Sequence, residues 1–384
     1  MTVLRTNLVF VALGLSLLGV VMVYSATYRF SGTEVLFVRL AHLGLGIGAF
    51  LVVSRVRYTL WRKYANVLYG VVFALLVLVL IPGIGLRING SSRWLDVGFM
   101  SLQPSEFAKI AAVVFVSCAL ARLKPGHGLP LKPLAAVGVL FGLVLIEPDF
   151  GTSVVLLTGV AGALWASEVR TRDLLLSGAG GVVFLAAVML LAPYRRERFL
   201  TFLDPWAVAD TSGYQNVQAM IAIKAGGVFG SGPGSGGQGA NVPEIDTDMI
   251  FALVGEELGV LGMIGVIAAF CFIAIAGVKI ALEAPSRMAR CVAAGLTTML
   301  TLQAVFNMGA AMGVLPLSGM TLPLISYGGS SLLGCFAAVG ILCRISEDSG
   351  LARVVKPRHP KGSEDSDRRR RYGRARDPRA VRGG

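Results

Sequence analysis

Ten long apolar segments constrain the fold of this chain more than any other feature of its sequence. Each has about 17 to 25 residues with few charges, the length that an α-helix needs to cross the hydrocarbon core of a bilayer. The segments are residues 7–25, 36–54, 64–82, 104–122, 131–147, 150–167, 173–192, 249–278, 287–312 and 328–345. Since lipid offers the backbone no hydrogen-bond partner, such segments are expected to be helical. The sequence therefore predicts an all-α polytopic membrane protein of about ten transmembrane helices.

The composition supports this class. Hydrophobic residues make up 55% of the chain and charged residues 15%, and the mean hydropathy is +0.72. A soluble protein carries about 25% charged residues, so this balance argues against a soluble enzyme. The first segment is not expected to be a cleaved signal peptide, because no small-residue cleavage site follows it before Tyr24 and the next apolar segment comes soon after.

Lysine and arginine in the short loops predict the orientation of the chain. They follow the second, fourth, sixth and eighth segments, at Arg55, Arg57, Arg62, Lys63, Lys124, Lys132, Arg170, Arg172, Lys279, Arg287 and Arg290. Because such loops stay in the cytoplasm, both termini are predicted to be cytoplasmic. A large extracytoplasmic loop, about residues 193–247, is then expected between the seventh and eighth segments. Its residues 213–225 have the apolar pattern of a helix at the membrane surface.

The chain is predicted to be one membrane domain, residues 1–350, followed by a basic, disordered cytoplasmic tail, residues 351–384. The tail holds 12 Lys and Arg against 4 Asp and Glu, and 12 − 4 = +8 of the total net charge of +13. Its run Arg368–Arg371 is typical of nucleic-acid binding or of contact with anionic lipid headgroups. Beside a membrane domain the lipid interpretation is favoured, and no nucleic acid is expected as a partner.

Acidic residues cluster where the long outer loop meets the eighth apolar segment, in residues 243–257. Ionisable groups near hydrocarbon are costly to keep and are functional candidates by default. Asp248 is placed in the first turn of the predicted helix, where the helix dipole favours an anion. Glu256 lies about 80° around the helix from Asp248 and about two turns deeper, so it is expected in the same cavity. Glu257 lies on the opposite side and is expected to bond to a neighbouring helix.

Further polar residues follow the third apolar segment on the same face. Arg93 and Trp94 place a cation and an aromatic ring at the membrane boundary, and Gln103 precedes a helix that starts with proline. Glu106 and Lys109 are three residues apart and can form an ion pair. A tryptophan anchor, a snorkelling arginine and a local salt bridge would explain these residues without a functional site. The repetition of such clusters on one face favours a site.

Three other outer segments have two interpretations each. The turn Glu147-Pro148-Asp149 is either solvated or part of the site, and Asp149 is expected to cap the next helix. Residues 321–331, which include Ser330, suit tight helix packing or the lining of a cavity. The glycine-rich run 230–239 contains a formal G-x-G-x-x-G pattern, but no strand precedes it, so a flexible loop is favoured over a nucleotide site.

Several motifs resemble those of the SEDS family, the shape, elongation, division and sporulation proteins. They occur in the order of that family and cover nearly all ten segments. They are Asn89–Trp94, Gln103–Lys109, Glu147–Thr152, Gly213–Gln215, Pro243–Asp248, Gly255–Gly259 and Pro323–Ser331. Residues 309–316 and 321–325 resemble the division branch of the family more than its elongation branch.

The resemblance implies a peptidoglycan glycosyltransferase that polymerises lipid II into β-1,4 glycan strands on the outer face of the cytoplasmic membrane, with inversion at the donor sugar. Asp248 corresponds to the essential aspartate and is the expected general base. The residues expected to bind substrate are Arg93, Trp94, Gln103, Glu106, Lys109, Asp149, Glu244, Glu256 and Ser330. Arg195 or Arg196 is expected to help stabilise the departing diphosphate. Asp246 stands where the family usually has histidine, so the protonation state of the acidic pair stays open.

The resemblance also implies partners. These are lipid II, a single-span class B penicillin-binding transpeptidase, other division proteins and membrane lipid, with the chain as a multi-pass protein of the cytoplasmic membrane at the division septum. A divalent cation, Mg²⁺ or Mn²⁺, is a possible cofactor with Asp248 as a possible ligand, and no organic cofactor is expected.

Two other functional classes fit part of the sequence. A lipid II flippase would also place charges in a membrane cavity, but it needs polar groups along a route to the cytoplasmic side, and here the charged motifs lie on the outer side. A noncatalytic scaffold for a septal transpeptidase would explain the apolar segments but not the buried acids.

Overall fold

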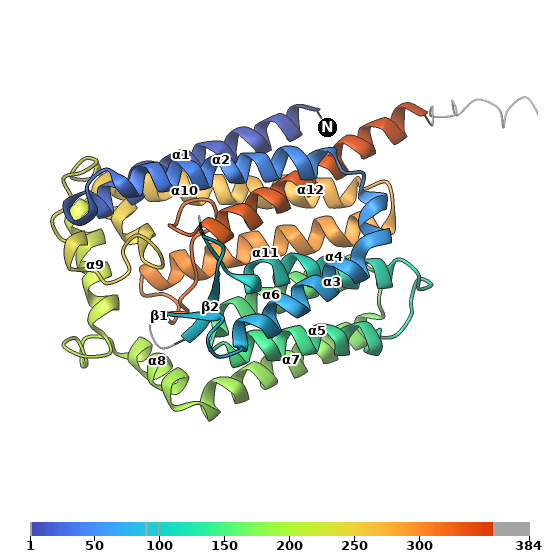
Figure 1. The fold of residues 1–384 in the computed structure, drawn as a ribbon, viewed down its shortest axis with the longest axis horizontal. Coiled ribbons are helices and arrows are strands. Elements are labelled where there is room, and N and C mark those ends of the chain that lie inside the picture. The colour runs from blue at the N-terminus through green and yellow to red at the C-terminus, as the bar shows by residue number, and fades with distance from the viewer. Residues whose placement is uncertain (1, 89–90, 99, 356–384) are drawn as a thin grey trace, which may run out of the picture.

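The computed structural model describes residues 2–88, 91–98 and 100–355. Ten long helices coincide with the ten predicted segments and run side by side along the long axis of the molecule (Figure 1). They are α1 (Thr2–Ser31), α2 (Glu34–Arg55), α3 (Tyr58–Leu80), α4 (Pro104–Leu120), α5 (Leu131–Ile146), α6 (Phe150–Trp165), α7 (Thr171–Leu191), α10 (Ile250–Leu282), α11 (Arg287–Ala311) and α12 (Gly329–Val355). The tail was predicted to begin at residue 351, but residues 351–355 are helical and form the end of α12; the rest of the predicted tail, from residue 356 onward, lies outside the described residues.

The lengths of these helices support a multi-pass membrane protein. Among the described residues, seven helices are long and apolar enough to cross a membrane, namely α1, α2, α3, α7, α10, α11 and α12. The helices α4, α5 and α6 have 17, 16 and 16 residues, which corresponds to about 25 Å of rise. The predicted polytopic class is confirmed, while the count of ten spans and the cytoplasmic placement of both termini stay predictions.

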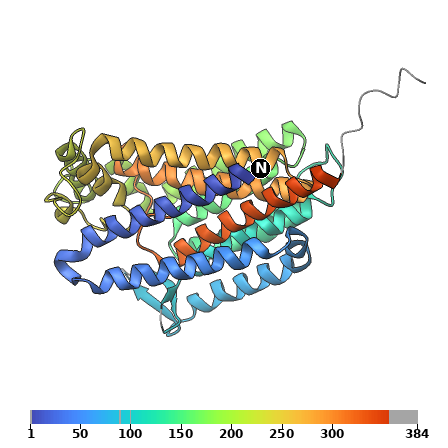
Figure 2. The same ribbon diagram turned by 90° about the horizontal axis from the view of Figure 1, so that it is seen from above.

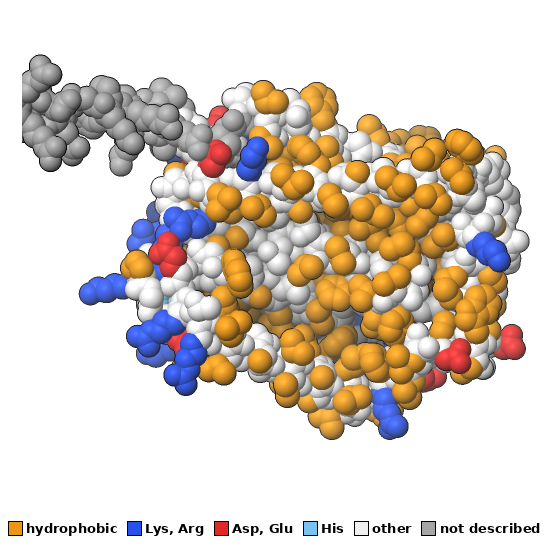
Figure 3. Space-filling model, turned by 180° about the vertical axis from the view of Figure 1, so that it is seen from behind, with side chains coloured by type: hydrophobic (Ala, Val, Ile, Leu, Met, Phe, Trp, Pro, Cys, Tyr) orange, Lys and Arg blue, Asp and Glu red, His pale blue; other side chains and the backbone are white. Residues whose placement is uncertain are grey.

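Charged and apolar side chains are distributed unevenly along the axis of the bundle. Lys and Arg side chains gather at one end of the molecule, and apolar side chains cover its middle (Figure 3). The first residues of α1 and the last turns of α12 lie together at one end of the bundle, and the loops around α8, α9 and residues 227–249 lie at the other (Figures 1 and 2). We refer to the latter as the outer end.

A small antiparallel sheet adds to the predicted helical architecture. Strands β1 (Gly85–Ile88), β2 (Ser91–Asp96) and β3 (Ser101–Leu102) lie between α3 and α4 in the order β1-β2-β3. Gly85 allows the sheet to approach α3, since a Cβ there would lie 2.2 Å from the carbonyl oxygen of Val79. The register of β1 and β2 shifts at Arg93: Leu86 pairs with Trp94 and Arg87 with Ser92, so Arg93 is the extra residue of a β-bulge.

The long outer loop is largely folded. It contains α8 (Pro193–Leu203), α9 (Tyr214–Gly226) and the short 3₁₀ helix η1 (Gly239–Asn241). The helix predicted at 213–225 is confirmed as α9, which buries Val217, Ala219 and Ala222 and packs on α10. The helix α8 was not predicted, because its charged sequence lacks the apolar periodicity that marks the others.

Two hydrophobic cores hold the bundle together. One is built mainly from α1, α2, α10, α11 and α12, and the other from α3, α4, α5 and α6. Small residues bring α6 against α11: a Cβ at Gly162 would lie 2.4 Å from the Thr298 hydroxyl oxygen, which is the close packing that membrane helices favour. None of the described side chains of α7 is buried, so this helix stands at the edge of the bundle.

The helix α10 is interrupted near its outer end. Gly259 has φ 66° and ψ −166°, which is not helical, and glycine adopts such a conformation without steric cost. Backbone hydrogen bonds of 2.9 to 3.3 Å join the break to segment 227–232: Val260 and Leu261 donate to the segment, and the carbonyls of Glu256 and Glu257 accept from it. The segment thereby satisfies backbone groups that the break would otherwise leave unpaired.

Candidate active site

Asp248 lies directly before α10, and its backbone is tied to the segment 320–327. The side chain of Asn307 on α11 donates one hydrogen bond to the carbonyl of Asp248, at 2.8 Å, and another to that of Met320, at 2.6 Å. Ser326 donates from its hydroxyl to the carbonyl of Thr247 at 2.6 Å. The N–H of Tyr327 donates to the carbonyl of Asp246 at 2.8 Å. The backbone carbonyls of three consecutive residues, 246 to 248, therefore each accept a hydrogen bond that holds the loop in place.

The Asp248 carboxyl is partly buried, and its pKa is raised to about 7. Burial is the main cause, and the Glu244 carboxylate adds to it. Arg198 and Arg93 act in the opposite direction, while Asp149 raises the pKa further. A carboxyl that titrates near neutral pH suits a general base, because it is both ionised in part and basic enough to take a proton.

Arg198 on α8 is the site residue that the sequence missed. A Cβ at Gly319 would lie 3.5 Å from both the Arg198 Nη1 and the Asp248 Oδ2, so the two side chains reach the same point. The expected cations were Arg195 and Arg196. Instead, the Arg195 guanidinium lies over the Phe150 ring, 5.4 Å from its centroid, and donates to a backbone carbonyl of α7. The run Arg195-Arg196-Glu197-Arg198 pointed to this helix but could not show which arginine faces Asp248.

Asp246 stays a second acid beside Asp248. Burial raises its pKa, a hydrogen bond from its own backbone lowers it, and the nearby Glu244 carboxylate raises it. Glu244 itself is exposed, has φ 54°, and accepts a hydrogen bond from the Thr247 hydroxyl at 3.0 Å. The loop before α10 thus holds three carboxyl groups, of which two have raised pKa values.

The turn between α5 and α6 is buried, which contradicts the interpretation as a solvated turn. Glu147 and Asp149 are 1% and 3% exposed. Asp149 caps α6 as predicted, since it accepts from the N–H of Thr152 at 3.1 Å, and it also accepts from the side-chain amide of Gln103 at 3.0 Å. Arg93 donates to the carbonyls of Glu147 and Pro148 at 2.8 and 2.7 Å. Arg93 therefore links the sheet to this turn.

The predicted ion pair between Glu106 and Lys109 is confirmed. Their charged atoms are 2.8 Å apart, and the two side chains are 6% and 3% exposed. Lys109 also donates to the side-chain oxygen of Gln303 at 2.9 Å, and Gln303 in turn donates to the carbonyl of Thr321 at 2.9 Å. This chain of contacts connects α4 to α11 and to segment 320–327.

Ser330 at the start of α12 joins the same region. Its hydroxyl accepts from the N–H of Gln103 at 2.9 Å and donates to the carbonyl of Ser101 at 3.1 Å. Gln103, Asp149 and Ser330 are thereby brought together at the head of α4. Trp94, partly buried on β2, pairs with Leu86 in the sheet.

Glu256 does not share the surroundings of Asp248. Its carboxylate accepts from the N–H groups of Gln238 and Gly239, both at 2.7 Å, and so holds the glycine-rich loop. The expectation of a common cavity failed because helical angles alone do not show which loop folds over a side chain. Glu257 bonds to the hydroxyl of Ser25 on α1, as expected for a contact with a neighbouring helix.

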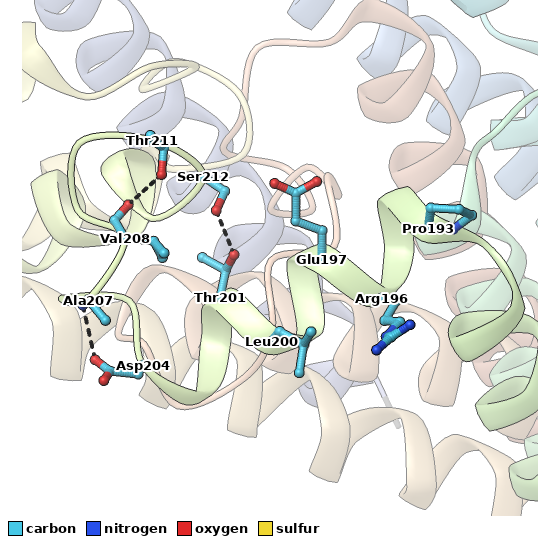
Figure 4. Close-up of a pocket in the computed structure, with 10 residues that line it drawn as sticks. All are labelled: Pro193, Arg196, Glu197, Leu200, Thr201, Asp204, Ala207, Val208, Thr211 and Ser212. Carbon is cyan, nitrogen blue, oxygen red and sulfur yellow. Dashed lines mark hydrogen bonds between the residues drawn. The ribbon is translucent and has the colours of Figure 1, made fainter.

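A separate open pocket of about 590 Å³ lies along α8 (Figure 4). Hydrogen bonds between Thr201 and Ser212, at 2.9 Å, and from Ala207 to Asp204, at 3.1 Å, close the turn beside it. Its charged lining residues on α8 are Arg196 and Glu197. Arg198 lies well around the helix from these side chains, so the pocket and Asp248 lie on different sides of α8.

The fold and the site define a multi-pass membrane protein with a cluster of interacting acids and cations at one end of its bundle. The profile of the cell cycle protein family that includes FtsW, RodA and SpoVE matches residues 5–350. The chain belongs to this family.

Curated relatives match along most of their length. A probable peptidoglycan glycosyltransferase FtsW from Coxiella burnetii is 39% identical over 360 residues, covering 89% of this chain and 96% of the relative. Stage V sporulation protein E from Bacillus subtilis is 36% identical over 353 residues, covering 89% and 96%.

Solved structures share the fold. One, from a study of a peptidoglycan synthase complex that coordinates polymerization and crosslinking, gives a TM-score of 0.74 at 30% identity, covering 89% of this chain and 97% of the other. The rod shape determining protein RodA of Thermus thermophilus gives 0.67 at 28% identity, covering 89% and 96%.

Proposed function

We propose that this protein is a peptidoglycan glycosyltransferase that polymerises lipid II into β-1,4 glycan strands on the outer face of the cytoplasmic membrane. The observation that carries the proposal is the juxtaposition of Asp248 with the cations Arg198 and Arg93 at the outer end of the bundle. Support comes from family relatives named as peptidoglycan glycosyltransferases, which the chain covers almost completely.

In the proposed reaction, Asp248 accepts the proton of the 4-hydroxyl of the acceptor sugar. The hydroxyl oxygen forms a bond to the anomeric carbon of the donor while the bond from that carbon to the lipid diphosphate breaks. The diphosphate leaves with the bonding electron pair, and Arg198 and Arg93 stabilise its charge. A single displacement of this kind inverts the α-linked donor to a β-linked product.

The neighbouring polar residues are proposed to hold the substrate. Gln103, Asp149 and Ser330 fix the head of α4, while Lys109 and Glu106 place a compensated charge pair deeper in the bundle. Trp94 offers a ring for a sugar or headgroup, and Glu244 acts on Asp248 through its charge. For Glu256, the contacts support an indirect role, because it holds the glycine-rich loop.

The acids around Asp248 fit a loosely held divalent cation. Among the described residues, no group of three His, Cys, Asp or Glu forms a metal cage. Mg²⁺ is often bound by one or two carboxylates together with substrate phosphates, however, and the mutual repulsion of Asp248 and Glu244 leaves negative charge that a cation would relieve. Asp248 and Glu244 would hold Mg²⁺ or Mn²⁺, which would supply further positive charge for the diphosphate.

The proposed setting is a division complex at the septum. The related synthase complex supports a partner that crosslinks the new glycan, for which we propose a single-span class B penicillin-binding transpeptidase together with other division proteins. The relatives named FtsW support the division branch.

Transport of lipid II is the second candidate, and one observation bears on it. At the inner end, two arginines form ion pairs: Arg290 pairs with Glu168 at 2.8 Å and Arg344 with Asp348 at 2.7 Å. A transporter would need polar groups that guide a headgroup past this end, so the arrangement favours an enzyme.

The test is polymerisation of lipid II by the purified protein together with its transpeptidase partner, read as glycan strands on a gel. We expect strands from the wild type and from Asp210→Asn, an exposed acid in the same outer loop, but not from Asp248→Asn. Retained polymerisation by Asp248→Asn would overturn the base assignment. Flipping of lipid II without polymerisation by the wild type would establish transport instead.

A further inference from the structure

We propose that Arg39, on the second turn of α2, is a positioning residue that keeps Asp248 in place for the reaction by holding the segment 320–327. The inference rests on the proposed function, since it assigns Arg39 a part in the same site. Arg39 belongs to none of the motifs that the sequence singled out, and it lies on a helix that contributes no other residue to the site.

The burial of Arg39 calls for an explanation. Its side chain is 0% exposed, the largest among the fully buried ones. Within the described part of the chain, no carboxylate forms an ion pair with it, and its Nε and Nη1 atoms have no hydrogen-bond partner. A buried unpaired cation destabilises a fold strongly, so the contacts that it does make are expected to matter.

Those contacts go to one short stretch of backbone. The Nη2 of Arg39 donates to the carbonyl of Ile325 at 2.8 Å and to that of Leu324 at 3.3 Å. Leu324 has φ 68°, a left-handed conformation that is unfavourable for leucine. The guanidinium therefore stabilises a strained turn by bonding the carbonyl of the strained residue and the one after it.

The next two residues of the turn hold the loop of Asp248. Ser326 accepts from the N–H of Leu322 at 2.7 Å and donates to the carbonyl of Thr247 at 2.6 Å. Tyr327 donates from its N–H to the carbonyl of Asp246 at 2.8 Å. The two residues that precede Asp248 are thus bonded to the two residues that follow the Arg39 contacts.

The close packing around the Arg39 guanidinium leaves no room for another side chain to take over its hydrogen bonds. A Cβ at Gly19 of α1 would lie 2.8 Å from the Ile325 Cα and 3.0 Å from the Arg39 Nη2, so α1 closes directly over the contact. A guanidinium bonds two carbonyls from a planar group, whereas a lysine ammonium is a single, strongly hydrated point charge. Lysine is therefore expected to restore only part of the effect.

The test compares Arg39→Met and Arg39→Lys with Arg62→Met, a control at an exposed arginine of α3. In the polymerisation assay, we expect Arg39→Met to lower kcat about 100-fold, since small displacements of a reacting group have effects of this size, with KM nearly unchanged. Arg39→Lys recovers part of the lost kcat, and Arg62→Met keeps the kcat and KM of the wild type.

Hydrogen–deuterium exchange provides a readout that does not depend on activity. We expect faster exchange in residues 244–249 and 320–327 of Arg39→Met than in the wild type, and the same direction in Ser326→Ala, which removes the link to Thr247. Should Arg39→Met fail to fold, Arg39→Lys and Ser326→Ala carry the test.

Two results would overturn the inference: unchanged exchange in both segments, or a loss of activity that falls on KM while kcat stays unchanged. A wild type that does not polymerise lipid II would overturn the proposed function instead, and the exchange result would still decide whether Arg39 holds the loop.

Discussion

Two acids at the outer end of α10 have different surroundings. Glu256, in the second turn of the helix, is 2% exposed and accepts two backbone hydrogen bonds of 2.7 Å from the glycine-rich loop. Asp248, at its head, is partly exposed and lies among charged side chains that oppose one another. At Asp248, burial and the neighbouring Glu244 carboxylate favour the protonated form of the carboxyl and raise its pKa. The carboxylate of Glu256 therefore holds the glycine-rich loop, whereas the carboxyl of Asp248 is able to take up a proton near neutral pH.

Substitution of the head acid tests this difference most strongly. We expect Asp248→Asn to lower kcat for polymerisation by about 100- to 10,000-fold, the range that a general base contributes. The thermal unfolding midpoint should not fall, because the amide avoids the burial of a charge. A large drop in that midpoint would mean that Asp248 is structural as Glu256 is.

The buried pair Glu106–Lys109 is an intermediate case, in which a side-chain cation compensates the acid. Lys109→Met should cost about 3 to 5 kcal/mol of stability because it leaves Glu106 unpaired. The double variant with Glu106→Gln should recover much of this loss. The free energies of unfolding in detergent of both single variants and of the double variant give the coupling energy between Glu106 and Lys109. If the losses in the two single variants add up to the loss in the double variant, the two charges do not stabilise each other.

Substitution of Glu256 should lower the stability of the protein rather than the rate of the reaction. Glu256→Gln weakens two charge-assisted hydrogen bonds, for a loss of about 1.5 to 3 kcal/mol. We expect faster proteolysis within residues 231–239 and a lower unfolding midpoint, with the pH profile of the remaining activity unchanged. An altered pH profile would place Glu256 in the reaction.

The smallest expected effect is a difference between Asp248 and Glu256 in how activity and stability depend on pH. In the proposed reaction Asp248 acts in its ionised form, and its pKa is about 7, so kcat/KM should rise about tenfold per pH unit below 7 and level off above it. The raised pKa has the opposite effect on folding: its contribution to stability is present below the unfolded pKa of about 3.9 and is lost as the pH rises through 7. Asp248→Asn should remove this loss, and Glu256→Gln should not.

The parts of the site that could be predicted from the sequence depend on local geometry. The spacing of Glu106 and Lys109, the capping position of Asp149 and the contact of Glu257 with a neighbouring helix all follow from the geometry of a helix. The loop contacts of Glu256 and the approach of Arg198 to Asp248 depend on how distant segments fold over one another. The charged helix α8 escaped detection for a related reason, since few apolar residues mark its buried face.

The interruption of α10 at Gly259 also divides the helix into a long inner part and a short outer part. From Val260 to Leu282 the helix is about 35 Å long, which is enough to cross the hydrocarbon layer of about 30 Å, whereas Ile250 to Leu258 adds only about 13 Å above it. The part of α10 beyond the break is therefore long enough to cross the lipid by itself, and Asp248 lies outside the length that the crossing requires. A lipid-linked sugar diphosphate anchored by its tail carries its headgroup outside the hydrocarbon as well, so the proposed reaction needs no step that lifts the substrate out of the membrane.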